Sequence, residues 1–333
     1  MLPCILGLSG LSLTADERAF FSEAEPAGFI LFGRNVADKG QLRALTDDLR
    51  ALTGRADLPI LIDQEGGRIS RLRPPEWPAF PAQSSFAALY QRAPFSAMEA
   101  ARVNAQAIGL TLSEVGINVA CLPVLDLGHP DGHSVIGDRA LGSEPMQVAA
   151  LGRSILDGLQ AGGVTGVIKH MPGHGRAQAD SHAELPVVTA PAAELEQDLA
   201  PFRRLAGRAR IGMTAHILYK EWDPGRPATL SSTIIGEIIR TGIGFEGLLI
   251  TDDVAMAALS GSIAERGAAA LAAGCDLVLH CSGKLGEAEQ LAASLPSMGE
   301  AARERLAGAV PPPAQDGEIE QLLAKRDALL ALA

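Results

Sequence analysis

The sequence predicts an α/β protein of a single domain, a TIM-type (β/α)8 barrel. Short apolar, β-branched runs alternate with longer, alanine-rich amphipathic stretches, and eight such pairs follow one another along the chain. All seven histidines lie at or just after the end of a predicted strand, and none lies in a predicted helix. An open, doubly wound sheet would show the same alternation. The polar strand ends favour the barrel, because its strand ends share one face.

The predicted strands are runs of four or five mostly apolar residues. They are Ile5–Leu8, Gly28–Phe32, Pro59–Asp63, Ile117–Cys121, Gly166–His170, Ile211–Ala215, Leu248–Thr251 and Leu277–His280. Several of the intervening helices have recognisable starts. Capping boxes are expected at Thr14 with Glu17, Ser96 with Glu99 and Ser262 with Glu265, and Ser143-Glu144-Pro145 places an N-cap before an early proline.

The chain end and one connection depart from the regular repeat. We expect residues 1–310 to form the barrel. Residues 311–333 are expected to form a short proline-rich break and a helix from about Glu318 to Leu332, packed on the barrel. The third connection runs for about thirty residues from Gln64, and loops of that length tend to be functional. Its Trp77 is either a packed loop anchor or a platform for a sugar.

Composition restricts the partners. The 333 residues are 47% hydrophobic, and 28 basic against 39 acidic side chains give a net charge of −11. An acidic chain without a basic run argues against nucleic acid or an anionic membrane as partner. The N-terminus, MLPCILGLSG, lacks the positive start and the length of a signal peptide or a membrane span. We therefore expect a cytoplasmic monomer that acts on a small molecule.

The four cysteines show no CxxC spacing. Cys4, Cys121, Cys275 and Cys281 lie in or beside apolar runs that resemble strands. They are interpreted as reduced core residues, with metal binding as the alternative.

The segment Gly166–Pro186 concentrates the polar chemistry, because three histidines fall within thirteen residues there. It begins as a buried strand and then reaches Lys169 and His170. His170 and His174 would share one face of a helix and pair on zinc. Pro172 and Gly173 between them indicate a loop instead.

Two further groups are candidates for catalysis. Asp180 precedes His182 by two residues, so its carboxylate can orient the imidazole, although a loop histidine bonded to a neighbour is the simpler reading. The run LLITDD ends in Asp252, a candidate nucleophile, with Asp253 as its structural neighbour. The competing role for Asp252 is to cap the segment from Val254 onwards.

Seven motifs in order carry a resemblance to a known family. They are IDQEGGRISRL (Ile62–Leu72), PVLDL (Pro123–Leu127), IGDRALG (Ile136–Gly142), KHMPGHG (Lys169–Gly175), DSH (Asp180–His182), MTAHILY (Met213–Tyr219) and ITDD (Ile250–Asp253). Together they resemble glycoside hydrolase family 3, and within it the single-domain bacterial β-N-acetylhexosaminidases of cell-wall recycling. The resemblance covers most of the chain, from Ile5 to about Cys281.

The resemblance implies a role for each matching residue. It implies that Asp252 is the nucleophile and that His182, paired with Asp180, is the acid and base. The positions that it assigns to sugar binding are Asp63, Arg71, Arg139, Lys169 and His170. It implies no cofactor and no metal. Three of these binding residues also have a purely structural alternative: Asp63 can pair with Arg68 or Arg71, and Arg71 and Arg139 can serve only as salt-bridge residues.

The resemblance implies a retaining exo-β-N-acetylglucosaminidase. Its expected substrates are muropeptides derived from peptidoglycan, and its expected intermediate is a glycosyl ester of Asp252. A related β-glycoside phosphorylase or β-glucosidase is the nearest alternative. A sugar-binding barrel without turnover and a metal-dependent barrel hydrolase are the alternatives from other classes.

Overall fold

The strands of the barrel run parallel and close on themselves. The structure is a computed structural model that describes residues 1–309, 314 and 317–333. Within this part of the chain eight strands pair in the order β1-β12-β11-β9-β7-β6-β3-β2. Their bounds are β1 Leu2–Gly7, β2 Pro26–Leu31, β3 Ile60–Ile62, β6 Val119–Ala120, β7 Thr165–Met171, β9 Ile211–Thr214, β11 Leu248–Asp253 and β12 Leu277–His280. Each overlaps one predicted strand, so the predicted closed barrel is confirmed.

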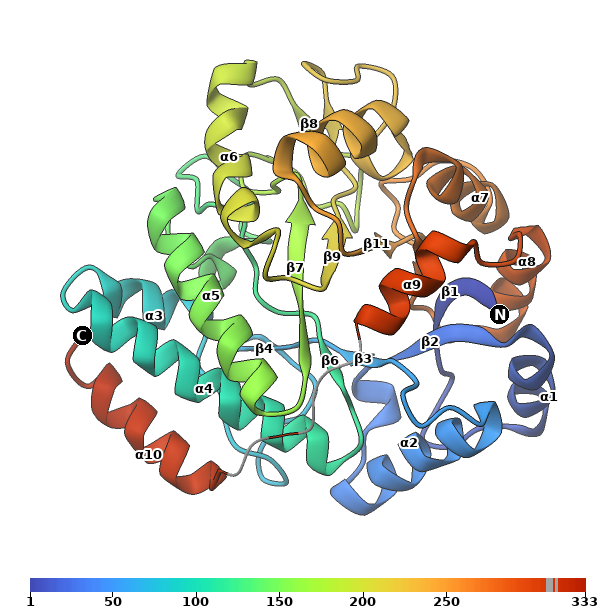
Figure 1. Cartoon of the computed structure of the whole chain (residues 1–333), viewed down its shortest axis with the longest axis horizontal. Coiled ribbons are helices and arrows are strands. Elements are labelled where there is room, and N and C mark those ends of the chain that lie inside the picture. Colours follow the sequence, from blue (N-terminus) through green and yellow to red (C-terminus); the bar gives the residue numbers. More distant parts are fainter. Residues whose placement is uncertain (310–313, 315–316) are drawn as a thin grey trace.

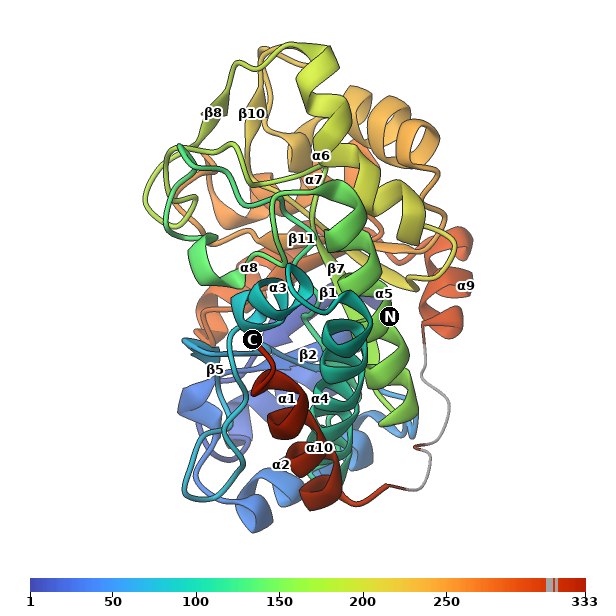
Figure 2. The same cartoon turned by 90° about the vertical axis from the view of Figure 1, so that its left-hand side faces the viewer.

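Helices surround the barrel, as Figures 1 and 2 show. The segments that follow the barrel strands in turn are α1 Ala15–Ala24, α2 Lys39–Thr53, α3 Gln83–Tyr90 with α4 Pro94–Glu114, α5 Pro145–Ala161, α6 Ala192–Leu205, a π-helical segment Ile234–Ile243, α7 Ile263–Ala273 and α8 Leu285–Ser294. Short 3₁₀ turns occupy Gly33–Asn35, Gly137–Arg139 and Ala228–Leu230. No helix in the described part combines the length and the apolar character that crossing a membrane requires.

Alternation along the strands divides the core into two clusters, because successive side chains point to opposite faces. One cluster fills the barrel and includes Ile30, Leu61 and Ile250. The other lies between the strands and the helices. Helix α9, Glu300–Gly308, adds Leu306 to the inner cluster and so closes the N-terminal end of the barrel. The polar strand ends therefore meet at the opposite end.

Of the three predicted capping boxes, two are present and one is absent. Thr14 and Ser262 both form the expected capping boxes. The box expected at Ser96 is wrong, because α4 begins at Pro94 and Ser96 already lies inside its first turn. Glu99 instead pairs with Arg102 and Lys325. Proline at the first helical position fixes the start without a side-chain cap, since its missing N–H has no partner there in any case.

The third connection is more ordered than its composition suggested. Strands β4 (Gln64–Gly66) and β5 (Ile69–Ser70) form an antiparallel hairpin, and α3 follows before α4. The connection before the long helix α4 therefore has the predicted length, but it contains a hairpin and a short helix. A second small pair, β8 (Val187–Val188) with β10 (Leu218–Tyr219), joins the loops after β7 and β9.

The C-terminal helix lies along α4 (Figure 1). This helix, α10, spans Ile319–Leu330, close to the predicted range. Its buried Arg326 donates to the side chain of Asn104 on α4 and to the backbone of Ala79 in the third connection. The predicted proline-rich break falls mainly on residues 310–313 and 315–316, outside the described residues.

Candidate active site

A cavity opens at the C-terminal ends of the barrel strands. Its volume is about 750 Å³ including the open mouth. The predicted site residues that line it are Asp63, Arg71, Arg139, Lys169, His170, His182 and Asp252. Asp180 does not line the cavity, but it bonds His182 from behind. The barrel thus gathers side chains that lie up to 189 positions apart, from 63 to 252, into one hollow.

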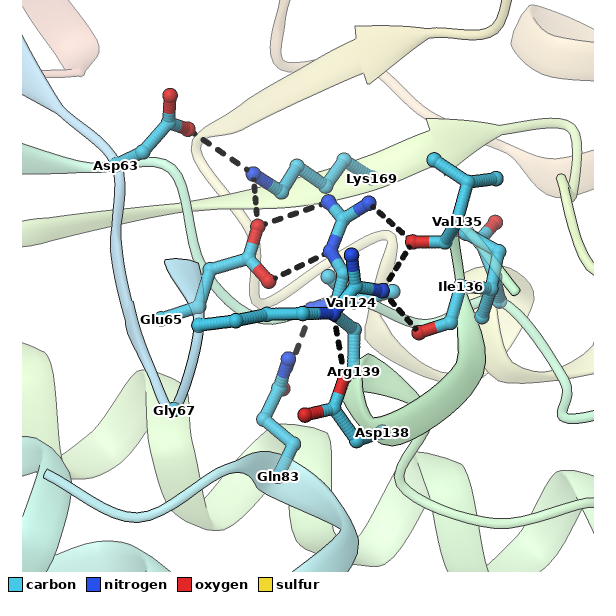
Figure 3. A network of polar contacts seen from close by, with 12 residues as sticks. Asp63, Glu65, Gly67, Gln83, Val124, Val135, Ile136, Asp138, Arg139 and Lys169 are labelled. Atoms are coloured by element: carbon cyan, nitrogen blue, oxygen red, sulfur yellow. Dashed lines mark hydrogen bonds and ion pairs between the residues drawn. The ribbon is translucent and has the colours of Figure 1, made fainter. Parts of the chain in front are cut away.

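A buried ionic cluster forms one wall of the cavity (Figure 3). The Nζ of Lys169 lies 2.7 Å from a Glu65 carboxylate oxygen and 3.3 Å from Oδ1 of Asp63. The guanidinium of Arg139 binds both oxygens of Glu65, at 2.8 and 2.9 Å. We call Asp63, Glu65, Arg139 and Lys169 the ionic wall. Glu65 is its centre, and the sequence reading assigned it no role.

The charges of the ionic wall stabilise one another. Burial raises the pKa of Glu65, but Lys169 and Arg139 outweigh it and bring the pKa to about 2. Burial also acts to raise the pKa of Asp63, and Lys169 and Arg71 reverse that effect to a net lowering. The pKa of Lys169 is raised despite its burial, because Glu65 and Asp63 face it. All these groups are therefore charged near neutral pH.

Arg71 approaches the same wall from the hairpin. Its Nη2 lies 3.0 Å from Oδ2 of Asp63, and its guanidinium sits over the ring of Phe32 at 5.4 Å. The buried side-chain amide of Gln64 accepts the backbone N–H of Arg71 and fixes the hairpin. Arg68 pairs with Asp138 instead. Of the two structural partners considered for Asp63, the structure therefore shows Arg71.

The two aspartates at the end of β11 have different surroundings. Oδ1 of Asp253 accepts the backbone N–H groups of Ala255 and Cys281, so Asp253 takes the capping role. In the described residues Asp252 accepts one bond, from the N–H of Asp253. Burial raises the pKa of Asp252, but the neighbouring His170, the backbone N–H of Asp253 and Lys169 together give a net lowering. Asp252 is thus an ionised carboxylate that faces the cavity and does not cap the segment after it.

His216 supports this strand end from behind. It is fully buried; its Nδ1 lies 2.7 Å from Oγ1 of Thr229 and its Nε2 lies 2.9 Å from the carbonyl oxygen of Asp253. Burial lowers its pKa, so the ring is neutral. Because a carbonyl only accepts, Nε2 holds the proton of the neutral ring. His216 therefore fixes the backbone beside Asp252.

The loop after β7 is anchored at its start. Gly173 has a φ of 138°, and a Cβ on Gly175 would lie 2.0 Å from the carbonyl oxygen of Leu127. Arg176 pairs with Asp198 at 2.7 Å on α6. His170 lies at the end of β7, and the two glycines with Pro172 explain why the chain beyond it is a loop, as predicted.

The far part of this loop is exposed. Oδ1 of Asp180 lies 2.8 Å from Nδ1 of His182 and also accepts the backbone N–H of His182. The side chain of His182 is 69% exposed. Burial raises the pKa of Asp180, but its bonds from His182 give a net lowering, so the carboxylate is ionised and orients the ring. We call Asp180 and His182 the loop dyad.

Comparison with known proteins identifies the barrel. Residues 6–310 match the family described as Glycosyl hydrolase family 3 N terminal domain. The chain belongs to glycosyl hydrolase family 3. A β-hexosaminidase of Alkalilimnicola ehrlichii is 43% identical over 284 residues, covering 84% of this chain and 80% of the relative. One of Aromatoleum aromaticum is 39% identical, covering 84% and 79%.

A solved structure of the family agrees over the whole barrel. NagZ from Neisseria gonorrhoeae, in complex with N-trifluoroacetyl-D-glucosamine, superposes with a TM-score of 0.89 and 30% identity, covering 99% of this chain and 97% of that one. The resemblance inferred from the motifs is thereby confirmed, and this family 3 chain is a glycoside hydrolase.

The remaining candidate residues of the family 3 chain either lie away from the cavity or only line it. Trp77 is 4% exposed and does not line the cavity, which supports the packed anchor over the sugar platform. Cys4, Cys121 and Cys275 are buried free thiols, and Cys281 lines the cavity with a pKa that burial raises. In the described residues no group of three or more metal-binding side chains is arranged to hold an ion.

Proposed function

We propose that this glycoside hydrolase is a retaining exo-β-N-acetylglucosaminidase. The observation that carries the proposal is that ionised Asp252 and the imidazole of His182 line one cavity, with Asp180 behind the ring. An ionised carboxylate suits nucleophilic attack, and an oriented imidazole suits proton transfer near neutral pH. The names of the relatives, β-hexosaminidases and NagZ, support an N-acetylhexosamine as the sugar removed.

The proposed reaction has two steps. In the first, Asp252 bonds to the anomeric carbon while the glycosidic oxygen departs and takes a proton from His182. In the second, His182 removes a proton from water, the water oxygen bonds to the anomeric carbon, and Asp252 is released. Two inversions retain the β configuration. A neutral imidazole as base avoids a second negative charge next to Asp252.

Asp63, Arg71, Arg139, Lys169 and His170 are the proposed sugar-binding residues. The ionic wall holds its charged groups in place before a ligand arrives, which reduces the cost of ordering on binding. Buried polar groups that hydrogen-bond a sugar hydroxyl reject analogues that lack it. This arrangement suits an exo-acting enzyme, which holds one terminal sugar in a blind pocket.

The biological setting is part of the proposal. We propose that the substrates are muropeptides derived from peptidoglycan, and that the enzyme acts in cell-wall recycling in the cytoplasm, as a monomer. No cofactor or metal takes part in the proposed steps, and neither nucleic acid nor a membrane is a partner. The net charge of −11 supports the last point.

The test is a set of assays with nitrophenyl β-glycosides of N-acetylglucosamine, glucose and N-acetylgalactosamine. The proposal expects fastest release from the N-acetylglucosamine substrate, with β-configured free sugar as first product. Fastest release from the glucoside would support a β-glucosidase, and a sugar phosphate formed in phosphate buffer would support a phosphorylase. No release from any glycoside would support a sugar-binding barrel. Activity lost after exhaustive chelation would support a metal-dependent enzyme.

A further inference from the structure

Asp126 is a fully buried carboxylate that has no assigned role, and it contacts the cavity wall through His170. It follows β6 within the apolar run PVLDL and is 0% exposed. Its Oδ2 lies 2.7 Å from Nδ1 of His170. Its Oδ1 accepts two backbone N–H groups, from His170 at 3.1 Å and from His174 at 2.6 Å. One side chain thus fixes both the ring and the backbone at the start of the loop.

The protons of this contact can be assigned from its chemistry. Burial raises the pKa of Asp126, but His170 and the other donors outweigh it and bring the pKa to about 2. The carboxylate is therefore an acceptor only, and Nδ1 of His170 must donate to it. In a neutral imidazole the other nitrogen, Nε2, then presents a lone pair. Within the described residues Nε2 has no protein partner, and His170 lines the cavity.

We propose that Asp126 is a positioning residue that fixes His170 as a hydrogen-bond acceptor towards the cavity, so that the sugar hydroxyl bound there must donate its proton. This inference rests on the proposed function, in that the ligand is a sugar. The neighbouring Lys169 can only donate, because an ammonium has no lone pair. Because both residues line the cavity, a donor and an acceptor together select for groups that can both accept and donate. A hydroxyl meets that requirement, and a carbonyl or a fluorine does not.

The variant Asp126→Asn separates this role from a merely structural one. The side-chain oxygen of asparagine can still accept both backbone N–H groups, so the loop start keeps its anchor. Its NH₂ group, in place of Oδ2, can only donate. His170 must then accept at Nδ1 and hold its proton on Nε2, so the polarity of its bond to the sugar is reversed.

The first measurement is ¹⁵N NMR of histidine-labelled protein without ligand, with His170→Gln used to assign the His170 signals. For the intact protein we expect the pattern of an imidazole protonated on Nδ1 alone. For Asp126→Asn we expect protonation on Nε2 alone. This result needs no turnover, so it stands or fails separately from the proposed glycosidase activity. A wild-type ring with a proton on Nε2, or a pattern that Asp126→Asn leaves unchanged, would overturn the inference.

The second measurement uses substrates in which each sugar hydroxyl is replaced in turn by hydrogen or by fluorine, which accepts but does not donate. At the hydroxyl bound by His170, both replacements should lower kcat/KM of the intact enzyme by about tenfold. Asp126→Asn should lower kcat/KM for the parent substrate by about tenfold, mainly through KM, and fluorine should there be better than hydrogen. Equal penalties for fluorine and hydrogen in the variant at every position would contradict the assignment.

Asp276→Asn is the matched control. Asp276 is also a buried carboxylate that accepts a backbone N–H, from Leu249, and it pairs with Arg240 and Arg305. It lies at the start of β12, at the opposite end of the barrel from the cavity. Its replacement should lower the midpoint of thermal unfolding and leave KM and the fluorine preference unchanged. If Asp276→Asn changes KM as Asp126→Asn does, the effect is general loosening and the inference is wrong.

Discussion

The ionic wall and the loop dyad each contain a close pair of polar side chains, with nearly equal contact distances but opposite surroundings. The Lys169–Glu65 pair spans 2.7 Å with side chains 3% and 1% exposed, and the His182–Asp180 pair spans 2.8 Å with side chains 69% and 33% exposed. A buried pair is costly to break, whereas an exposed one contributes little to stability. Contact distance alone therefore does not indicate what either pair does. The wall suits rigid binding, and the dyad suits a group that transfers protons at the mouth.

The difference follows from where each pair sits in the fold. In the wall, Lys169 lies on β7 and Asp63 directly follows β3, so the barrel fixes both, while Glu65 lies on the hairpin and Arg139 on the 3₁₀ turn Gly137–Arg139. The dyad lies far along a loop whose start is held by Gly173, Gly175 and Arg176. Asp252, on β11, lies in the cavity that both regions line. If the ionic wall binds the sugar and the loop dyad transfers protons, substitutions in the two regions should affect stability and catalysis separately.

Asp252→Ala should have the largest effect on turnover, because both proposed steps of the reaction use this carboxylate. We expect turnover to fall roughly 10⁴-fold or more while the fold persists, since Asp252 accepts one backbone bond and is not in the packed interior. A 2-fluoro sugar that traps the intermediate should label Asp252 in the intact enzyme, as mass spectrometry of peptides will show. Labelling of Asp253 or Asp126 instead would contradict the assignment.

His182→Ala should affect catalysis according to the leaving group. A dinitrophenolate departs without a proton, so its glycoside should still form the intermediate. A sugar leaving group should lose the roughly 10²–10⁴-fold that a positioned acid provides. Because His182 is also the proposed base, the activated substrate should show a burst followed by slow turnover. Stopped-flow release of dinitrophenol measures both phases.

Azide provides the control for this prediction. Azide attacks without needing a base, so it should restore the second step in His182→Ala and yield the β-glycosyl azide. Equal slowing of activated and unactivated substrates, with no azide effect, would assign His182 to binding or structure. The acid would then be sought among His170, His174 and Glu184.

Glu65→Gln should show how much stability is lost when the buried ionic wall is broken. The change leaves Lys169 and Arg139 without their shared negative partner, and a loss of about 3–5 kcal/mol in the free energy of unfolding is expected. Asp138→Asn, which breaks the exposed pair with Arg68, should lose less than about 1 kcal/mol. Urea unfolding of both variants tests the contrast. Equal losses would mean that the ionic wall does not stabilise the fold as a buried cluster.

The sequence predicted the strands and the site positions better than the partners of those positions. Apolar runs identify strands, and a barrel brings their ends together, so Asp252 and Lys169 could be placed without coordinates. Glu65 was missed because it lies among glycines that indicate a turn. Its spacing of two from Asp63 was the usable signal, since the strand direction continues into β4. Asp126 had a signal too, because a carboxylate inside an apolar run needs a buried partner.

Acid should destabilise the protein in two windows. Burial lowers the pKa of His174 to about 4, so the folded state favours the neutral ring. Stability from His174 is complete above the unfolded value of about 6.5 and is lost as the pH falls towards 4. The pKa values of Glu65 and Asp126 are lowered to about 2, so their contribution is lost below about pH 4, as the pH falls towards 2.

The variant His174→Phe tests the first window. Between pH 6.5 and 4, the free energy of unfolding of the variant should depend less on pH than that of the intact protein. The difference corresponds to about one proton, or about 3 kcal/mol over that range. The loss of stability between pH 4 and 2 should be unchanged. His216, whose pKa burial also lowers, should account for what remains of the first window. Urea unfolding at half-unit pH intervals measures the slope. An unchanged slope in the variant would show that His174 is already charged in the folded state above pH 6.

Asp180→Asn should have the smallest effect on stability and thereby complete the comparison. Because the dyad is exposed, its loss should change the free energy of unfolding by less than about 0.5 kcal/mol. The imidazole remains but loses the carboxylate that orients it, so turnover of unactivated substrates should still fall, by less than in His182→Ala. Unfolding curves and leaving-group series on the same preparation measure both. A large loss of stability with unchanged leaving-group dependence would reverse the division and make Asp180 a structural anchor of the loop.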